Sequence, residues 1–300
     1  MSAEFEFDWV DAFTDAPFCG NGCVVVHGAA DISLKDRLAL VRETSLAECA
    51  YLVPSEKADF GVRYYLADKE ILMAGHPTVA TVASLISRGL IKLQNGSARF
   101  DLEVGAGVMP ISVVANENAA PQITMTQAAP EFGTVFEAAV IADIYGLHAA
   151  DIVGTPQVVS TGTPFCITVL KNKDALRRAV LDVDRLHAFR AANGTTRAEL
   201  MEPFLVTLGG ETAAGDTFSR LLLAPPSLAE DPFTGSATGC MAAYLWKYGL
   251  IDKPEFVAQQ GHWLGRPGLA QVQVLGAPNA ISGVNIGGSG RVLMRGVLHL

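Results

Sequence analysis

The alternation of apolar and polar residues along this chain predicts more strands than helices. In the first half, runs rich in β-branched and aromatic residues and bounded by Gly, Pro or Asp predict strands at 5–13, 23–27, 50–54, 61–67 and 98–114. The apolar spacing of Leu34, Leu38 and Val41 instead predicts a helix over 33–45, with Ser33 as its N-cap. The second half repeats this layout, with helices expected over 135–145 and 173–192 and strands over 157–159, 165–170, 204–208 and 217–223.

A glycine-initiated motif occurs twice in the chain. Gly75-His76-Pro77-Thr78 begins one apolar stretch, and Gly235-Ser236-Ala237-Thr238 begins another 160 positions later. The copies share Gly75/Gly235, Thr78/Thr238, Ala83/Ala243, Leu85/Leu245, Gly89/Gly249 and Leu90/Leu250. Each predicts a turn followed by a helix whose N-terminus presents unpaired N–H groups and a positive dipole end. Two such ends facing each other would hold a small anionic molecule between two related lobes.

The first of these helices is too apolar for the surface of a protein, so a sheet has to surround it. We therefore predict an α+β fold of two pseudo-symmetric lobes, each a β-barrel-like bent sheet around a central helix. Residues 1–125 are expected to form the N-terminal lobe and 126–300 the C-terminal lobe, with the last strand able to return to the N-terminal lobe. The turn residues at the end of 122–130 mark this segment as the candidate linker.

Composition narrows the class of protein. Half of the residues are apolar, and the formal net charge is −9 without any stretch rich in Lys and Arg, which argues against nucleic acid and anionic membranes as partners. The acidic first residues do not resemble a signal peptide, and no apolar run approaches the roughly 20 residues that span a bilayer. The five cysteines are scattered, so neither a disulfide framework nor a structural zinc site is expected. We expect a reduced, cytoplasmic protein.

Three positions are candidates for chemistry, and each has a structural alternative. Glu48 enters an apolar run, where burial would raise its pKa from about 4.3 toward the range of a general base, although an edge-strand glutamate that reaches solvent would look the same. His76 can contact a ligand from the helix start, or can simply cap that helix. Asp231 precedes the second helix, where an acid can also serve only to complement the helix dipole.

Together these residues carry a family resemblance. The spaced series consists of Phe13-Thr14, Phe18-Cys19-Gly20-Asn21, Glu48, Glu70 with Ala74-Gly75-His76-Pro77-Thr78, Glu230-Asp231-Pro232-Phe233-Thr234-Gly235-Ser236, and Gln260-Gly261 with Gly265-Arg266-Pro267. Over nearly the whole chain it resembles the PhzF-like (phenazine biosynthesis isomerase-like) family of the diaminopimelate epimerase fold superfamily. The resemblance implies two barrel lobes with the active site in the cleft between them, catalysis without metal or organic cofactor, and a homodimer.

The resemblance also implies roles for individual residues. Glu48 matches the family's catalytic glutamate, and His76 and Asp231 match its partners across the cleft. Gly75, Gly235 and Ser236 match positions that hold the polar end of the substrate. Two departures concern neighbouring residues, since the chain has Ala47-Glu48-Cys49 where the family commonly has Ser-Glu-Thr, and Gly20-Asn21-Gly22 where it has Gly-Asn-Pro.

The same superfamily contains racemases and epimerases that use two cysteines, one immediately before each motif glycine. This chain has Ala74 and Thr234 there, and neither side chain can remove an α-proton. Cys19 precedes a predicted strand rather than a helix, so it is interpreted as structural.

The sequence therefore predicts an isomerase that moves a proton within a small carboxylate-bearing substrate by one-base catalysis. The alternatives are a dehydratase or lyase acting on a hydroxylated amino acid or a related acid, and a non-catalytic small-molecule binder.

Overall fold

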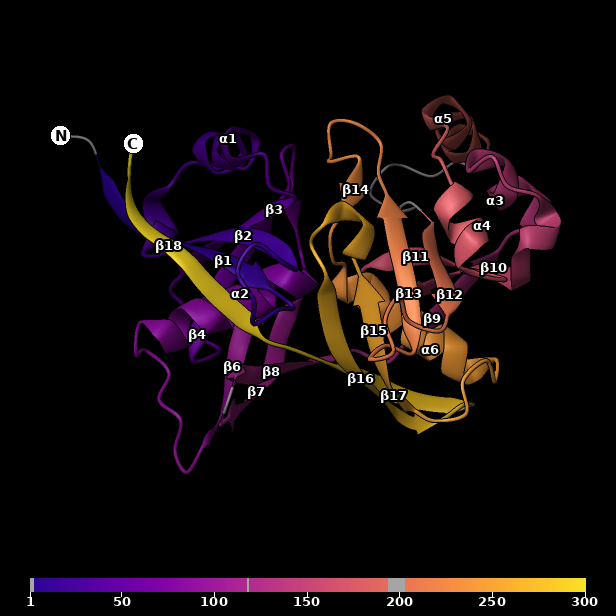
Figure 1. The fold of residues 1–300 in the computed structure, drawn as a ribbon. Helices are drawn as coiled ribbons and strands as arrows, with labels where there is room; N and C mark the ends of the chain where they lie inside the picture. The colour runs from indigo at the N-terminus through magenta and orange to yellow at the C-terminus, as the bar shows by residue number, and fades with distance from the viewer. Residues whose placement is uncertain (1–2, 118, 194–202) are drawn as a thin grey trace.

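The computed structural model of the protein describes residues 3–117, 119–193 and 203–300. Figure 1 shows two lobes side by side, the indigo-to-magenta part of the chain around α2 (Gly75–Ser87) and the pink-to-gold part around α6 (Gly235–Lys247). The yellow strand β18 (Gly290–His299) crosses back and pairs with β1 (Glu4–Ala12) in antiparallel register, beside the N-terminus.

The N-terminal lobe contains most of the elements that position the candidate residues. Besides β1, α2 and β18, its elements are β2 (Asn21–Val26), η1 (Ala29–Asp31), α1 (Leu34–Thr44), β3 (Glu48–Val53), β4 (Phe60–Tyr65), β5 (Glu70–Ile71), β6 (Ser97–Val104), β7 (Gly107–Asn116) and β8 (Ala119–Gln127).

The C-terminal lobe follows the same plan, with additional helices on its outer side. Its elements are β9 (Glu131–Val135), α3 (Ala138–Ile144), η2 (Ala149–Asp151), β10 (Ile152–Ser160), β11 (Pro164–Leu170), α4 (Lys173–Arg178), α5 (Val183–Ala192), β12 (Phe204–Leu208), β13 (Thr217–Leu222), β14 (Glu230–Asp231), α6, β15 (Glu255–Gln260), η3 (His262–Leu264), β16 (Gly268–Ala277) and β17 (Ala280–Gly288).

Strand pairing shows that the two lobes repeat one topology. In the first lobe β2 pairs parallel with β3, and β4 pairs antiparallel with β5 but parallel with β6. In the second lobe β11, β12, β13, β14 and β15 make the equivalent parallel and antiparallel pairs. The first eleven residues of each central helix are buried, from Gly75 to Leu85 and from Gly235 to Leu245. The α+β fold with two pseudo-symmetric lobes, predicted from the repeat, is confirmed.

Several local predictions need correction. The linker expected over 122–130 is strand up to Gln127, because β8 pairs with both β7 and β17 and so connects the two lobes by hydrogen bonds. The helix expected over 173–192 is interrupted, since Asn172 and Asp182 each cap a separate helix. The cap at Ser33 is confirmed, with Asp36 N donating to Ser33 Oγ at 3.2 Å. The lobe boundary after residue 125 lies within β8 and stays a prediction.

The central helices touch at their N-termini through two glycines. A Cβ atom on Gly75 would lie 2.7 Å from Gly235 Cα and 2.7 Å from Ser236 N. A Cβ atom on Gly235 would lie 2.7 Å from the ring of Phe13, whose aromatic ring stacks on Phe233 with centroids 4.3 Å apart. Only glycine therefore lets the two helix ends approach this closely. Among the helices of the described ranges, none combines the length and the apolar character that crossing a bilayer would take.

Gly75→Ala tests this contact. The new methyl group would meet backbone atoms that cannot rotate away, so we expect the free energy of unfolding to fall by about 1–3 kcal/mol, the usual cost of overpacking. Chemical denaturation measures the change. The matched control is Gly133→Ala on β9, where the nearest atom to a new Cβ is Val158 Cβ at 3.5 Å, an ordinary contact. Equal stability of the two variants would contradict the tight helix contact.

Candidate active site

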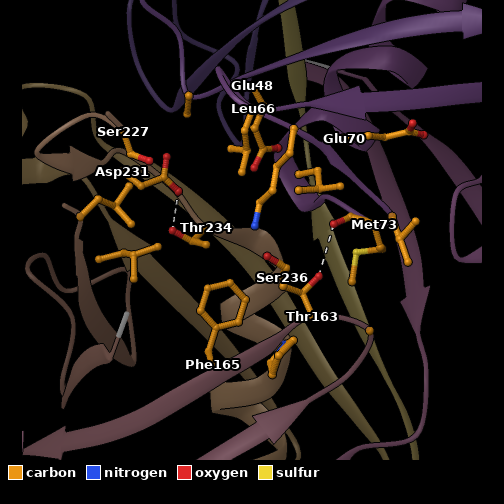
Figure 2. A pocket seen from close by; sticks show the side chains of 18 of the residues that line it. Glu48, Leu66, Glu70, Met73, Thr163, Phe165, Ser227, Asp231, Thr234 and Ser236 are labelled. Carbon is orange, nitrogen blue, oxygen red and sulfur yellow. Dashed lines mark hydrogen bonds between the residues drawn. The ribbon is translucent and has the colours of Figure 1, made fainter. Parts of the chain in front are cut away.

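A cavity of about 400 Å³ lies where the two lobes meet. Figure 2 shows that Glu48 and Asp231 approach it from different lobes, with Ser236 and Thr163 at its lower side. Most of its wall is apolar and comes from Ala47, Leu66, Ile71, Leu72, Met73, Pro164, Phe165, Leu221, Leu223 and Leu228. Such a wall excludes water from a small organic molecule and strengthens the effect of the few polar groups around it.

Glu48 is the first residue of β3, so the parallel pairing of β3 with β2 fixes its backbone beside Cys23. Its side chain is 18% exposed, and the atom Oε2 is buried without a hydrogen-bond partner. Burial raises the pKa of this carboxyl well above its usual value, and the nearby negative charge of Asp231 raises it further. Glu48 therefore keeps its proton to a higher pH than an ordinary glutamate does.

His76 lies in the first turn of α2, with Nδ1 3.8 Å from Glu48 Oε2. The amide nitrogen of Asn21 faces Nδ1 at 3.1 Å, and an amide nitrogen can only donate. Because burial lowers the pKa of His76 to about 3, its imidazole is neutral. Nδ1 is then the unprotonated nitrogen and Nε2 carries the proton, but Nε2 is buried without a partner. The site thus holds one unpaired donor and one unpaired acceptor.

Asp231 closes β14 just before α6 and is 5% exposed. Its Oδ1 accepts a hydrogen bond from Asn21 Nδ2 at 2.8 Å, and its Oδ2 accepts one from the Thr234 hydroxyl at 2.5 Å. Burial raises the pKa of Asp231 to about 6, against the opposing effect of these two donors. The adjacent Glu230 instead forms a two-pronged ion pair with Arg220, with Nη2 2.7 Å from Oε2, so it holds the strand rather than the site.

The predicted residues are brought together by the fold. Glu48, Asp231 and Ser236 line the cavity, His76 adjoins Glu48, and the helix contact places Gly75 against Gly235. This placement agrees with the roles expected of the six residues, and the roles themselves stay predictions.

Sequence reasoning missed the residues that support this arrangement. Asn21 Nδ2 also lies 2.9 Å from Phe233 O, so its two N–H groups are shared among three acceptors and connect β2 to both His76 and the loop around Asp231. Gln260 fixes the same loop from β15, donating to Asp231 O at 2.8 Å and accepting from Thr234 N at 3.1 Å. A signal existed for both, since each is a polar residue at the end of an apolar strand and within a motif of the resemblance.

The departures from the family pattern also have a structural reading. Ala47 lines the cavity and offers no side-chain donor, and the thiol of Cys49 lies 3.8 Å from Thr44 Oγ1. Cys19 precedes strand β2, and no cysteine is among the residues that line the cavity. Within the three described ranges, no three His, Cys, Asp or Glu side chains are grouped so that they could bind a metal ion.

The chain is similar in sequence to proteins that are named isomerases. The chain is 31% identical over 299 residues to YddE of Salmonella typhimurium, an uncharacterized isomerase, with 95% of each chain covered. It is 25% identical over 293 residues to the trans-2,3-dihydro-3-hydroxyanthranilate isomerase of Pseudomonas aeruginosa, covering 97% of this chain and 98% of that one. The relatives are thus named isomerases, the enzyme class predicted from the sequence.

Solved structures share the fold. A PhzF-family phenazine biosynthesis protein from Bacillus anthracis has a TM-score of 0.83 at 24% identity and covers 99% of both chains. A hydroxyproline epimerase from Agrobacterium vitis has a TM-score of 0.68 at 13% identity, covering 99% of this chain and 93% of its own, so it shares the fold.

A sequence profile of the PhzC-PhzF family, described as phenazine biosynthesis-like protein, matches residues 10–296. The match spans both lobes and every residue of the candidate site. This chain belongs to the PhzC-PhzF family.

Proposed function

We propose that this protein is an isomerase that moves a proton within a small carboxylate-bearing substrate, with Glu48 as the single base and without a cofactor. The observation that carries the proposal is a pair of unpaired buried atoms: Oε2 of Glu48, which lines the cavity, and Nε2 of His76, which adjoins Glu48 at the N-terminus of α2. Leaving buried polar atoms unpaired costs stability, and a bound substrate can supply both missing partners.

In the proposed reaction, the ionised Glu48 takes a proton from an activated carbon, and the electron pair of the broken C–H bond moves into the conjugated system of the substrate. Protonated Glu48 then returns a proton to another carbon of that system. The raised pKa of Glu48 suits both steps, because a carboxylate with a higher pKa is a stronger base and, once protonated, can still return its proton.

The other residues would stabilise the charge that develops on the substrate. His76 Nε2–H can donate to an oxygen that becomes negative, and the N-termini of α2 and α6 direct N–H dipoles toward the same region. Asp231 keeps the pKa of Glu48 high and orients the substrate through the cleft. Gly75, Gly235 and Ser236 would hold the polar end of the substrate.

The named substrate of the Pseudomonas aeruginosa relative supports a small cyclic carboxylate as the substrate class for this chain. A homodimer and a cytoplasmic location complete the proposal, as the family resemblance and the composition imply.

Glu48→Gln tests the proposed base. In heavy water, NMR would follow trans-2,3-dihydro-3-hydroxyanthranilate and a panel of small cyclic carboxylates. We expect the wild-type protein to exchange or rearrange substrate protons, and Glu48→Gln to be slower by about 10²- to 10⁴-fold, the usual contribution of a general base. Glu43→Gln, at an exposed position on α1, is the matched control.

Two results would contradict the proposal: no exchange across the panel by the wild-type protein, or equal exchange by Glu48→Gln. Loss of a water mass from the substrate would instead identify a dehydratase that uses the same base.

Asp231→Asn tests the electrostatics through pH-dependent stability. The pKa of Asp231 is about 6 in the folded protein and 3.8 for an ordinary aspartate. Between these two pH values the folded state keeps the Asp231 proton, whereas the unfolded state has lost it. Wild-type stability should therefore fall relative to that of Asp231→Asn as the pH rises from 4 to 7, by about 3 kcal/mol at most. Denaturant unfolding across this range measures the difference, with the exposed Asp252→Asn as control. Parallel curves for Asp231→Asn and the wild type would show that Asp231 is not perturbed.

A further inference from the structure

Lys69 lies at the end of a tight hairpin beside the cavity. The pairing of β4 with β5 matches Tyr65 with Glu70, and Leu66 N continues it by donating to Lys69 O at 2.9 Å. Ala67 and Asp68 form the two-residue turn. This short connection fixes the backbone of Lys69 opposite Leu66.

Strand alternation directs Lys69 to the cavity side of this hairpin. Directly opposed residues of an antiparallel pair share one face, and residues two positions apart along a strand share it too. Leu66, Lys69 and Ile71 therefore lie on one face of the hairpin, and all three line the cavity, as do their neighbours Glu70 and Leu72. Tyr65 and Glu70 form the adjacent opposed pair of this hairpin, and the Tyr65 hydroxyl donates to Glu70 Oε2 at 3.1 Å.

The carboxylates around the cavity leave the Lys69 ammonium group without a counter-ion. Glu70 is turned away from the cavity centre in Figure 2, toward its partners Tyr65 and Arg63. Within the described part of the chain, no carboxylate lies within 4.0 Å of the ammonium nitrogen of Lys69. Lys69 is half-buried, and among the described residues that line the cavity it is the only Lys or Arg.

An ammonium group beside an apolar wall is costly unless an anion accompanies it. Glu48 and Asp231 would by themselves repel an anionic substrate, so an acidic substrate needs a compensating cation in the same cavity. The helix N-termini provide only partial charges, whereas Lys69 provides a full one.

We propose that Lys69 determines the specificity of this cavity for acidic substrates by forming an ion pair with the carboxylate of the substrate. The proposal rests on the proposed function, because it takes the cavity as the substrate site. In this arrangement Lys69 positions the acid group, while Glu48 and His76 face the carbon skeleton. Lys69 takes no part in proton transfer, so its removal should weaken substrate binding more than turnover.

Binding of a matched acid and amide tests the proposal. Titration calorimetry would compare 2-amino-3-hydroxybenzoate with 2-amino-3-hydroxybenzamide, which differ only in the charged group. We expect the wild-type protein to prefer the acid by about 10- to 100-fold, the range for a hydrogen bond between charged groups. Lys69→Met should lose that preference by weakening acid binding alone, and Lys69→Arg should keep most of it. Lys35→Met, at an exposed position on α1, is the control.

The proposal is overturned if the wild-type protein shows no preference for the acid, or if Lys69→Met keeps the preference. Kinetics give a second readout, since Lys69→Met should raise KM for the carboxylate substrate with little change in kcat. Measuring acid binding also in Glu48→Gln separates the two proposals. If the protein prefers the acid but proton exchange does not depend on Glu48, only the proposed function is contradicted. If exchange depends on Glu48 but Lys69→Met still prefers the acid, only the role of Lys69 is contradicted.

Discussion

The site depends on the close approach of two buried helices at Gly75 and Gly235. Because neither residue has a Cβ, the N-termini of α2 and α6 come together and direct unpaired N–H groups toward one region. The surrounding sheets hold the helices there, and their duplicated topology places them symmetrically. Strand β8 pairs with β7 of one lobe and with β17 of the other, and β18 returns the end of the chain to β1 of the N-terminal lobe.

That helix contact also determines the electrostatics of the site. It brings Glu48 from one lobe close to Asp231 from the other beside a cavity with largely apolar walls. Burial raises the pKa of both carboxyls, and the charge of Asp231 raises the pKa of Glu48 further. Asn21 links the lobes through a single amide that contacts both His76 and Asp231. Burial keeps His76 neutral, and the amide nitrogen that faces Nδ1 fixes its tautomer. The arrangement costs stability, because it leaves Glu48 Oε2 and His76 Nε2 unpaired, and such a cost is typical of sites that bind a ligand.

The sequence allowed the repeat and the fold class to be predicted, because glycine spacing and apolar helices are local signals. The roles of the six candidate residues came from the family resemblance, and those roles stay predictions. Asn21 was not predicted as a bridge, since its partners lie 55 and 210 positions away and only the fold brings them together. Lys69 was missed for a different reason, as Asp68-Lys69-Glu70 is typical of a solvated turn. The linker predicted over 122–130 was wrong, because this segment is held as strand β8 up to Gln127 by its long-range pairing with β17, and the turn residues come only after it.

The most direct test of the account is the ionisation of Glu48 itself. Carbon NMR of protein labelled at glutamate side-chain carboxyls, assigned with Glu48→Gln, would give its titration midpoint in the wild-type protein and in Asp231→Asn. The account predicts a midpoint above the usual 4.5 in the wild type, and a lower midpoint once the charge of Asp231 is removed. A midpoint at or below 4.5 would contradict the account, because an ordinary carboxylate at that position would not be the tuned base that the site requires.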